Sequence, residues 1–357
     1  MTKPFVSVLI PVYNVATYLE QCLESVVHQD MQELEIICVN DGSTDASPEI
    51  LQRYAEKYSH IKLINRSNGG YGSAVNLALS HATGEYVAIL EPDDYIAEDM
   101  YSSLYAHACK HNKPDIVKGG WWDVIEEPQL KLTRKPDKPA KIETPFTVHE
   151  FPEILIWHPS IWSSLYKRDF LNAAGIRMVE AKGAGWVDNP FMFQAYCEAN
   201  SICFLNKPLY YYRCFSINSS SVLKDCSIPI SRMNEIFDYI RRKKIREPEI
   251  IKQAYVRALI YVRTLSTNPN VTPENTKALR KLIARMHRPI VLRITPYWYQ
   301  WYNKHCGYFS RIPRPGSKYA NELRKLPPLI RRAPQIIKNN GVKGTAKKLI
   351  QKIRSKL

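Results

Sequence analysis

The first 120 residues or so repeat one pattern, in which a short apolar and often β-branched run precedes a segment whose apolar residues recur at helical spacing. The apolar runs lie at residues 5–10, 34–39, 61–64 and 86–90. The first of them lacks polar alternation, which is typical of a parallel strand buried on both faces. The helical segments lie at residues 18–27, 47–58 and 73–81. Successive strand and helix units favour right-handed crossovers, so this α/β pattern predicts a Rossmann-like, mostly parallel sheet wound with helices.

The rest of the chain changes character twice. Residues 126–145 are rich in Pro and Lys and indicate an exposed excursion. A strand over 161–166, a helix over 189–198 and a strand over 209–214 follow. From about residue 228 the spacing is helical, with breaks expected near Pro248, at residues 268–270 and at Pro296. We therefore expect a first domain over residues 1–227, with halves of about 1–120 and 121–227, then a helical C-terminal appendage over 228–310 and a tail over 311–357.

The positive charge of the chain is concentrated in the tail. The formal net charge is +16, and from Arg311 onward fourteen Lys and Arg residues face one acidic residue, Glu322. A basic end of this kind indicates an anionic surface as its partner. The sequence contains no run of about 18 apolar residues and no cleavage pattern near its start, so we expect neither a spanning helix nor a signal peptide. Eight cysteines without a CxxC pair argue against a zinc or dithiol site.

Polar side chains follow three of the predicted strands at the point where each strand ends. Residues 11–14 include Tyr13, residues 40–45 include Asp41, and residues 91–94 carry three carboxylates. In open α/β sheets ligands bind beyond the carboxyl ends of the strands, so we expect these loops to converge. The ring can stack on a base, Asp41 can accept a base or ribose proton, and the carboxylates can hold a divalent cation against phosphate oxygens. Hard oxygen ligands favour Mg²⁺ or Mn²⁺.

Each of these pieces also has a purely structural interpretation. Residues 41–45, Asp-Gly-Ser-Thr-Asp, form a good turn with a helix cap, and Asp93 and Asp94 could cap a helix that starts near Glu98. The turn Asn-Gly-Gly-Tyr-Gly at residues 68–72 lacks the spacing of either phosphate-loop signature. Their occurrence together, in order and each after a strand, favours a functional site.

With these blocks in place the sequence closely resembles the family 2 glycosyltransferases, which are inverting enzymes of the GT-A fold that use nucleotide-diphosphate sugars. The resemblance rests on VSVLIPVYN (6–14), YLEQCLESVVHQ (18–29), VNDGSTD (39–45), NGGYGSAVN (68–76), GEYVAILEPDD (84–94), IWSSLYKRDFL (161–171), WVDNPF (186–191) and YYYR (210–213). Eight blocks in the family's order, over about 215 residues, make this a specific signal.

The resemblance implies roles for individual residues. Pro11, Val12 and Tyr13 would line the base, Asp41 would contact uracil or ribose, and Asp93 would hold the metal. Asp188 falls at the position of the catalytic base, although by its sequence context it could instead cap the helix that Asn189-Pro190 opens. The expected substrate-binding residues are Pro11, Val12, Tyr13, Asp41, Gly69, Gly70, Glu91, Pro92 and Asp93.

Four positions depart from the family pattern. Glu91 replaces the first Asp of the Asp-x-Asp motif and adds a methylene, and Val75 stands where many members have Arg. Val187 replaces the acid that often precedes the base, and Ser164 replaces a Lys common in the acceptor region. These departures bear on which donor is used and how the acceptor is held.

The sequence therefore predicts an inverting hexosyl- or N-acetylhexosaminyl-transferase that uses Mn²⁺ or Mg²⁺. It would move a sugar, by family frequency from a UDP-linked donor, to a hydroxyl of a glycan or lipid-linked saccharide in bacterial-type surface polysaccharide assembly. The first alternative is a catalytically silent sugar-nucleotide-binding scaffold. The second and less favoured one is a polyanion or nucleic-acid binder that acts through the basic tail. No nucleic-acid partner is expected, because the tail lacks a base-reading module.

The tail also predicts where the enzyme works. Apolar residues recur at helical spacing between basic ones near its end: Ala346, Leu349, Ile350, Ile353 and Leu357. Such a helix can lie in an anionic headgroup layer, so we expect a cytoplasmic enzyme peripherally associated with the membrane. A merely solvated basic end is the alternative.

Overall fold

The computed structural model describes residues 3–125, 130–135, 144–181, 185–214, 225–266, 268, 270–291 and 294. All of these residues fall in one compact unit, residues 1–294, whereas residues 295–357 form a second unit that lies outside the described residues. The predicted tail and the expected break at Pro296 belong to that second unit.

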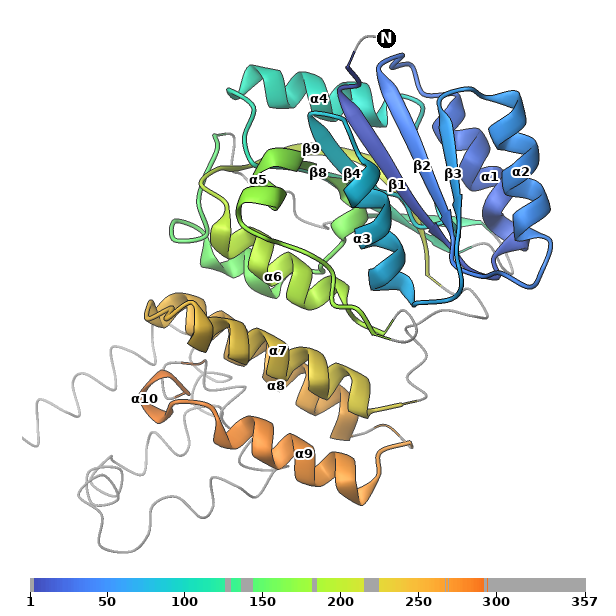
Figure 1. The fold of residues 1–357 in the computed structure, drawn as a ribbon. Coiled ribbons are helices and arrows are strands. Elements are labelled where there is room, and N and C mark those ends of the chain that lie inside the picture. Colours follow the sequence, from blue (N-terminus) through green and yellow to red (C-terminus); the bar gives the residue numbers. More distant parts are fainter. Residues whose placement is uncertain are drawn as a thin grey trace, which may run out of the picture. The chain divides into compact units, whose positions relative to one another are not determined.

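The strands of the described residues form one nine-stranded sheet (Figure 1). Their order is β3-β2-β1-β4-β8-β6-β9-β5, with β7 paired to β6. The strands are β1 (Val6–Val12), β2 (Leu34–Asn40), β3 (Ile61–Asn65), β4 (Tyr86–Ile89), β5 (Tyr95–Ile96), β6 (Ile116–Ile125), β7 (Lys131–Lys135), β8 (Ser164–Lys167) and β9 (Ile202–Arg213). In this order β1 lies between β2 on one side and β4 on the other, so the direction in which the chain adds strands changes at β1.

The helices of the first half cover both faces of the sheet. They are α1 (Ala16–Val27), α2 (Ser47–Lys57), α3 (Tyr71–His81) and α4 (Met100–Lys110). Helix α1 connects β1 to β2, and α2 connects β2 to β3, so the chain moves toward one edge of the sheet. Helix α3 connects β3 back to β4 on the other side of β1, and it therefore lies on the face opposite α1 and α2 (Figure 1). Strand β1 is buried at every position, which agrees with its continuous apolar sequence.

The helices of the second half pack beyond the sheet. They are α5 (Arg168–Ala173), α6 (Asp188–Glu198), α7 (Ser227–Arg242), α8 (Pro248–Ser266), α9 (Pro273–Ala284) and α10 (Arg288–Val291), with 3₁₀ helices η1 (Pro152–Ile156) and η2 (Ile161–Ser163). Helix α8 packs on η1, and α7 packs on α6, α8 and α9. The expected helical stretch thus begins at Ser227, and its breaks fall at Pro248 and between Ser266 and Pro273. No helix within the described ranges is long and apolar enough to cross a bilayer.

Two features of the middle of the chain were not specified by the sequence analysis. The sheet is parallel from β3 to β4, but β8 pairs antiparallel with both β4 and β6, because the chain reaches it without a strand–helix–strand crossover. Strand β7 lies inside the expected exposed excursion and pairs antiparallel with β6. Its charged, largely exposed sequence suits the edge position that it takes.

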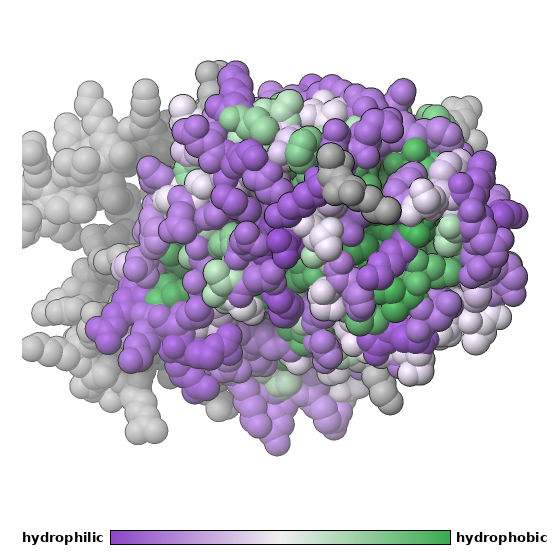
Figure 2. Space-filling model, turned by 45° about the horizontal axis from the view of Figure 1, so that its top comes forward, coloured by the Kyte–Doolittle hydropathy of each residue, from purple (hydrophilic) through white to green (hydrophobic). Residues whose placement is uncertain are grey.

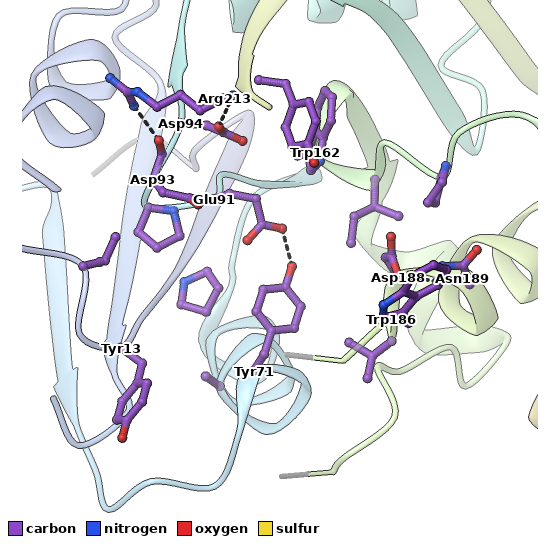
Figure 3. Close-up of a pocket in the computed structure, with 18 of the residues that line it drawn as sticks. Tyr13, Tyr71, Glu91, Asp93, Asp94, Trp162, Trp186, Asp188, Asn189 and Arg213 are labelled. Atoms are coloured by element: carbon purple, nitrogen blue, oxygen red, sulfur yellow. Dashed lines mark hydrogen bonds between the residues drawn. The ribbon is translucent and has the colours of Figure 1, made fainter. Parts of the chain in front are cut away.

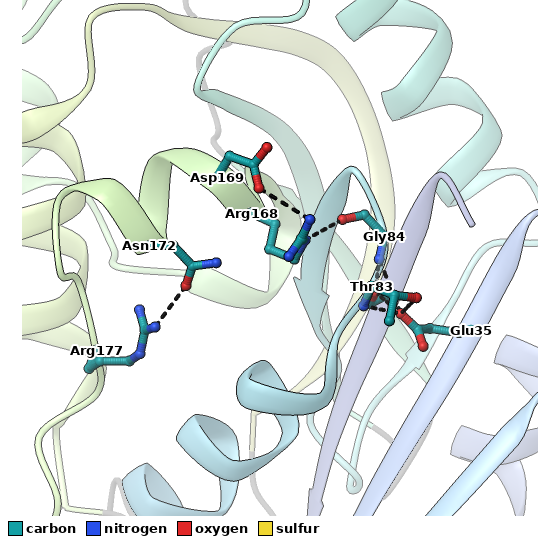
Figure 4. Close-up of polar contacts among 8 residues, drawn as sticks. Glu35, Thr83, Gly84, Arg168, Asp169, Asn172 and Arg177 are labelled. Carbon is teal, nitrogen blue, oxygen red and sulfur yellow. Dashed lines mark hydrogen bonds and ion pairs between the residues drawn. The ribbon is translucent and has the colours of Figure 1, made fainter. Parts of the chain in front are cut away.

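A polar network fixes the amino-terminal end of the sheet, opposite the end where ligands bind in such folds (Figure 4). Glu35 Oε1 accepts hydrogen bonds from the hydroxyl of Thr83 at 2.8 Å and from the backbone N–H of Gly84 at 3.1 Å. Arg168 Nε donates to the carbonyl of Gly84 at 2.8 Å. The network therefore links β2, the start of β4 and helix α5.

Side chains on the outside follow the usual division of polarity. On the face drawn in Figure 2, hydrophilic residues cover most of the surface and hydrophobic ones show in patches between them. The exposed large hydrophobic side chains of the described residues are Tyr13, Leu130 and Leu132. Of these, only Tyr13 lies at the cavity described next.

Candidate functional site

A cavity of about 990 Å³ opens at the carboxyl ends of β1, β2 and β4. Its walls come from the loops after these strands, from the start of α3 and α6, from residues 156–162 and from one side of α8. A volume of this size suits a small-molecule ligand such as a nucleotide sugar. The residues expected at the site that line it are Pro11, Val12, Tyr13, Asp41, Gly70, Glu91, Pro92, Asp93 and Asp188. Gly69 is adjacent to this lining, where it contacts Asp41.

Asp41 holds the glycine turn against the end of β2. Its Oδ1 accepts the backbone N–H of Gly69 at 2.9 Å, and its Oδ2 accepts that of Gly70 at 2.8 Å. Arg66 Nε lies 3.2 Å from Oδ1. The carboxylate is only 2% exposed. Asp41 therefore shapes the turn directly, and a nucleotide contact would use the lone pairs that these bonds leave.

The glycine turn depends on glycine at two positions. Gly70 has φ +89°, a conformation that side chains with a Cβ rarely adopt. At Gly72 a Cβ would lie 2.1 Å from the carbonyl oxygen of Val179, so glycine allows residues 178–179 to pass close to α3. The turn therefore needs glycine at Gly70 for its backbone conformation and at Gly72 for close packing.

Glu91 and Tyr71 form a pair across the floor of the cavity (Figure 3). The Tyr71 hydroxyl, at the start of α3, donates to Glu91 Oε1 at 2.5 Å. Burial raises the pKa of Glu91 to about 8, and the neighbouring charges of Asp93 and Asp188 add to this rise. The replacement of aspartate by the longer glutamate thus places this carboxyl within reach of a tyrosine that the sequence analysis did not assign.

Asp93 and Asp94 lie in different environments although they are adjacent. Asp94 is 1% exposed, and its carboxylate accepts from the Tyr210 hydroxyl at 2.9 Å and from the Arg213 backbone N–H at 2.8 Å. Asp93 lines the cavity, and the Arg213 guanidinium donates to its backbone carbonyl. Neither caps the next helix, since α4 begins at Met100, so that structural interpretation is wrong.

Asp188 is the first residue of α6 and lies across the cavity from Glu91 (Figure 3). The N-cap residue of this helix is Val187, and no side chain forms a hydrogen bond to the cap. The interpretation of Asp188 as the helix cap is therefore wrong. Oδ1 of Asp188 accepts from the Asn189 backbone N–H at 3.0 Å and from Nδ2 at 2.9 Å. Burial raises the pKa of the Asp188 carboxyl, while these bonds and the charge of Arg257 oppose the rise.

Aromatic side chains line the part of the cavity near Asp188. Trp162 stacks on Tyr210 with ring centroids 4.2 Å apart and on Tyr212 with centroids 5.1 Å apart. Trp186 meets Tyr261 edge to face, with centroids 4.8 Å apart. Trp186 also has φ +60°, an uncommon conformation for a residue other than glycine. A wall of rings next to a carboxylate is suited to the apolar face of a sugar.

The carboxyl groups at the cavity can hold a divalent cation only when a bound substrate supplies further oxygen atoms. Asp93 and Glu91 present carboxyl oxygens to the cavity, and oxygen is the ligand atom that Mg²⁺ and Mn²⁺ prefer. Within the described ranges no group of three His, Cys, Asp or Glu side chains could hold an ion unaided. Mg²⁺ is commonly bound by one or two carboxylates plus substrate phosphates, and this residue set fits that arrangement.

Sequence reasoning missed several residues of the site. Tyr71 and Arg213 lie inside matched motifs but were given no role, and the motif was the signal that could have indicated them. Trp186 and Asn189 flank Asp188 in another motif. Arg257 lies on α8, for which the sequence indicated only helical spacing.

Comparison with solved structures establishes the class of fold. Residues 1–349 of S. aureus TarS in complex with UDP-GlcNAc match with a TM-score of 0.70 and 22% identity, over 85% of this chain and 89% of that chain. The protein thus has the GT-A fold of nucleotide-sugar glycosyltransferases. At this identity the likeness concerns the fold alone.

Sequence comparison agrees with this fold. The model of Glycosyl transferase family 2 matches residues 7–172, so this part of the chain is similar to that family. The uncharacterized glycosyltransferase EpsJ of Bacillus subtilis (strain 168) is 34% identical over 222 residues, 59% of this chain and 61% of that protein. The poly(ribitol-phosphate) beta-glucosyltransferase of Bacillus spizizenii is 41% identical over 118 residues, 32% of this chain and 18% of that protein. The matches therefore span less than two thirds of the length of either relative.

Proposed function

We propose that the protein is an inverting glycosyltransferase that moves a sugar from a nucleotide-diphosphate sugar to a hydroxyl of a saccharide acceptor. The observation that carries this proposal is that one cavity of a chain similar to family 2 contains Asp93 and Asp188 on different walls (Figure 3). Direct displacement needs groups on both sides of the reacting carbon, one side for the leaving diphosphate and the other for the attacking hydroxyl. The expected enzyme is of the hexosyl- or N-acetylhexosaminyl-transferase class.

The donor would lie along the ends of β1, β2 and β4. Tyr13 is 51% exposed and can stack on a base beside Pro11 and Val12, while the turn held by Asp41 approaches the ribose. We expect the nucleotide to be UDP, and the UDP-GlcNAc complex of TarS, which has the same fold, supports this expectation. The diphosphate would then reach the loop that carries Glu91, Pro92 and Asp93.

A divalent cation, Mn²⁺ or Mg²⁺, would be held by Asp93 together with the donor diphosphate. When bound, it would neutralise negative charge that develops on the departing diphosphate. Arg213 fixes the loop that presents Asp93, because it donates from its guanidinium to the Asp93 carbonyl and from its backbone to Asp94. Glu91 is oriented by Tyr71 at the same place.

Asp188 would be the base. Its carboxylate accepts the proton of the acceptor hydroxyl as that oxygen bonds to C1 of the sugar and the bond from C1 to the diphosphate oxygen breaks. A pKa raised by burial makes an ionised carboxylate a stronger base than one in water, which suits this step. Attack from the face opposite the leaving group inverts the anomeric configuration.

The acceptor would be a glycan or lipid-linked saccharide. The rings of Trp162, Tyr212, Trp186 and Tyr261 near Asp188 can pack against a sugar face. His158 lines the same region with a pKa lowered to about 4 by burial, so it is uncharged at neutral pH. Likeness to a poly(ribitol-phosphate) beta-glucosyltransferase supports a role in bacterial surface polysaccharide assembly.

The place of work and the domain division are further parts of this proposal. We expect the division of the chain at residues 227 and 310, with the basic tail binding an anionic membrane surface from the cytoplasmic side. The tail lies outside the described residues, so this expectation rests on its sequence. A lipid-linked acceptor would supply the reason for such an attachment.

A donor panel tests the proposal. Full-length protein with Mn²⁺ is incubated with UDP-, GDP- and dTDP-sugars in the presence of free saccharides, and released nucleotide and thermal stabilisation are measured. Release from a UDP-sugar is expected. Stabilisation without release from any donor would indicate the silent scaffold, and a preference for GDP or dTDP donors would contradict the UDP assignment.

A further inference from the structure

Arg257 of α8 is buried at the wall of the cavity and donates to three acceptors on two segments, the 3₁₀ helix η1 with the residue after it and the start of α6. It is 5% exposed. Nε donates to the carbonyl of Leu155 at 2.7 Å, Nη2 donates to the carbonyl of Trp157 at 2.5 Å, and Nη1 donates to Asn189 Oδ1 at 2.5 Å. The planar guanidinium presents its donors in fixed directions, so it can hold these three acceptors in one arrangement.

Asn189 connects this arginine to the candidate base. Its side chain is buried, and its amide accepts from Arg257 through Oδ1 and donates through Nδ2 to Asp188 Oδ1 at 2.9 Å. The orientation of the amide is determined by its partners, because arginine only donates and an ionised carboxylate only accepts. Arg257 therefore fixes which side of Asn189 faces Asp188.

Asn189 also determines how the carboxylate of Asp188 is oriented. The backbone N–H of Asn189 also donates to Oδ1 of Asp188, at 3.0 Å, so both bonds end on the same oxygen. Neither of these two bonds uses Oδ2, which is therefore the oxygen that can meet an acceptor hydroxyl. The carboxylate can then present one defined oxygen to the attacking group.

Other titratable groups around Asp188 come from several neighbouring elements, and one of them, Tyr261, also bonds to Arg257 and Asn189. They are Tyr71 of α3, Glu91 after β4, Tyr166 of β8, Tyr212 of β9 and Tyr261 of α8. Arg257 is the cation among the groups that act on the pKa of Asp188, and its charge lowers that pKa against the effect of burial. Its removal should therefore be visible in the titration of Asp188.

We propose that Arg257 is a positioning residue for glycosyl transfer, and that the helical segment after the sheet orients the base Asp188 through the amide of Asn189. This inference rests on the proposed function of Asp188. It means that α8 contributes, through Arg257, to the geometry of the active site. A purely structural arginine would fasten α8 to η1 through Leu155 and Trp157 and would have no effect on the base. The two roles are separable, because only the bond to Asn189 leads to Asp188.

Three variants of the full-length protein test the inference. Asn189→Asp keeps the acceptor for Arg257 but removes the Nδ2 donor to Asp188. Arg257→Gln removes the positive charge and the guanidinium that donates to Leu155, Trp157 and Asn189. Arg285→Gln is the matched control, because Arg285 also joins helical elements, through Asn234 Oδ1 at 2.5 Å and Asp238 Oδ1 at 2.6 Å, but does not line the cavity.

The first readout is the pKa of Asp188, measured by ¹³C NMR titration of carboxyl-labelled aspartate and assigned by loss of the resonance in Asp188→Asn. We expect a rise of about half a unit or more in Asn189→Asp and in Arg257→Gln, and no change in Arg285→Gln. This readout needs no donor. If Asp188 titrates as in the wild type in both Asn189→Asp and Arg257→Gln, the inference is wrong. If only one of them folds, its titration alone decides.

The second readout is nucleotide release with the donor that the panel selects. In Asn189→Asp we expect kcat to fall about 10- to 100-fold with little change in donor KM, and the acidic limb of the kcat profile to move to higher pH. Unchanged kcat would overturn the inference. If the wild type releases no nucleotide from any donor, the proposed function fails, and the NMR titration still decides whether Arg257 acts on Asp188.

Discussion

Nζ of Lys118 donates to the hydroxyl of Ser160 at 2.7 Å, so that a buried ammonium supports the turn that leads into the cavity wall. Lys118 also donates to the Ser160 carbonyl at 2.9 Å and to the Ser163 hydroxyl at 3.1 Å. All of these acceptors are uncharged. Ser160 has φ +31°, so the lysine stabilises a turn with an uncommon backbone conformation.

This lysine predicts a particular pH dependence of stability. Burial lowers the pKa of Lys118 to about 7, whereas an unfolded lysine titrates near 10.4. Between these values the unfolded chain binds more protons, so the contribution of Lys118 to the free energy of unfolding rises with pH. Urea unfolding is measured for the wild type and Lys118→Met from about pH 6.5 to about pH 9.5, which covers most of the rise. The free energy of unfolding of the wild type should increase with pH relative to that of the variant. Parallel curves would contradict the prediction.

Gly70→Ala should damage both stability and donor binding. The conformation at Gly70, with φ +89° and ψ 160°, is unfavourable for alanine, which predicts a loss of about 1–3 kcal/mol in the free energy of unfolding. The change also disturbs the turn bonded to Asp41, so UDP should bind more weakly in calorimetric titration. Gly175→Ala is the matched control, since it has φ +65°, open space for a Cβ and a place outside the cavity. It should lose stability but keep UDP affinity, and equal affinity losses would refute this role for Gly70.

Asp93→Ala should abolish turnover that depends on Mn²⁺, because this side chain is the one assigned to the cation and the diphosphate. Thermal stability should change little, since Asp93 faces the cavity whereas Asp94 carries the buried bonds to Tyr210 and Arg213. The surface variant Asp169→Ala, whose side chain is 78% exposed, serves as the control. Near wild-type nucleotide release by Asp93→Ala, equally insensitive to a chelator, would show the metal assignment to be wrong.

Neutralising the end of the tail should release the protein from membranes. In full-length protein, Lys347, Lys348, Lys352, Arg354 and Lys356 are changed to Gln together. Each basic residue near an anionic surface contributes about 1 kcal/mol, so cosedimentation with phosphatidylglycerol vesicles at physiological salt should be lost while nucleotide release is retained. Phosphatidylcholine vesicles provide the uncharged comparison. Equal sedimentation of both proteins with anionic vesicles would rule out the anchor.

Local patterns were enough to predict the elements that form the first half of the sheet. The continuous apolar runs became β1, β2, β3 and β4, and helical spacing became α1, α2 and α3, with shifts of one to two residues at most ends. These elements follow one another in sequence and pair with near neighbours. The direction of β8 could not be predicted in this way, because it is set by pairing with β4 and β6 from distant parts of the chain.

The site shows the same limit. The loops after the strands brought Tyr13, Asp41 and Asp93 to one cavity, as the convergence of parallel strands predicts. The bonds from Tyr71 to Glu91 and from Arg257 to Asn189 join residues 20 and 68 positions apart. Nothing in the spacing of α8 distinguishes Arg257 from its other basic residues, since the difference is the burial that tertiary packing creates.

The most direct test of the account is the transfer rate of Asp188→Asn. Asparagine keeps the size of the side chain but cannot take the proton of an acceptor hydroxyl, so with the selected UDP-sugar and Mn²⁺ we expect kcat to fall by about 10²- to 10⁴-fold. Donor KM and the melting temperature should stay close to those of the wild type. A variant that folds, binds donor and transfers sugar at the wild-type rate would contradict the assignment of Asp188 as the base.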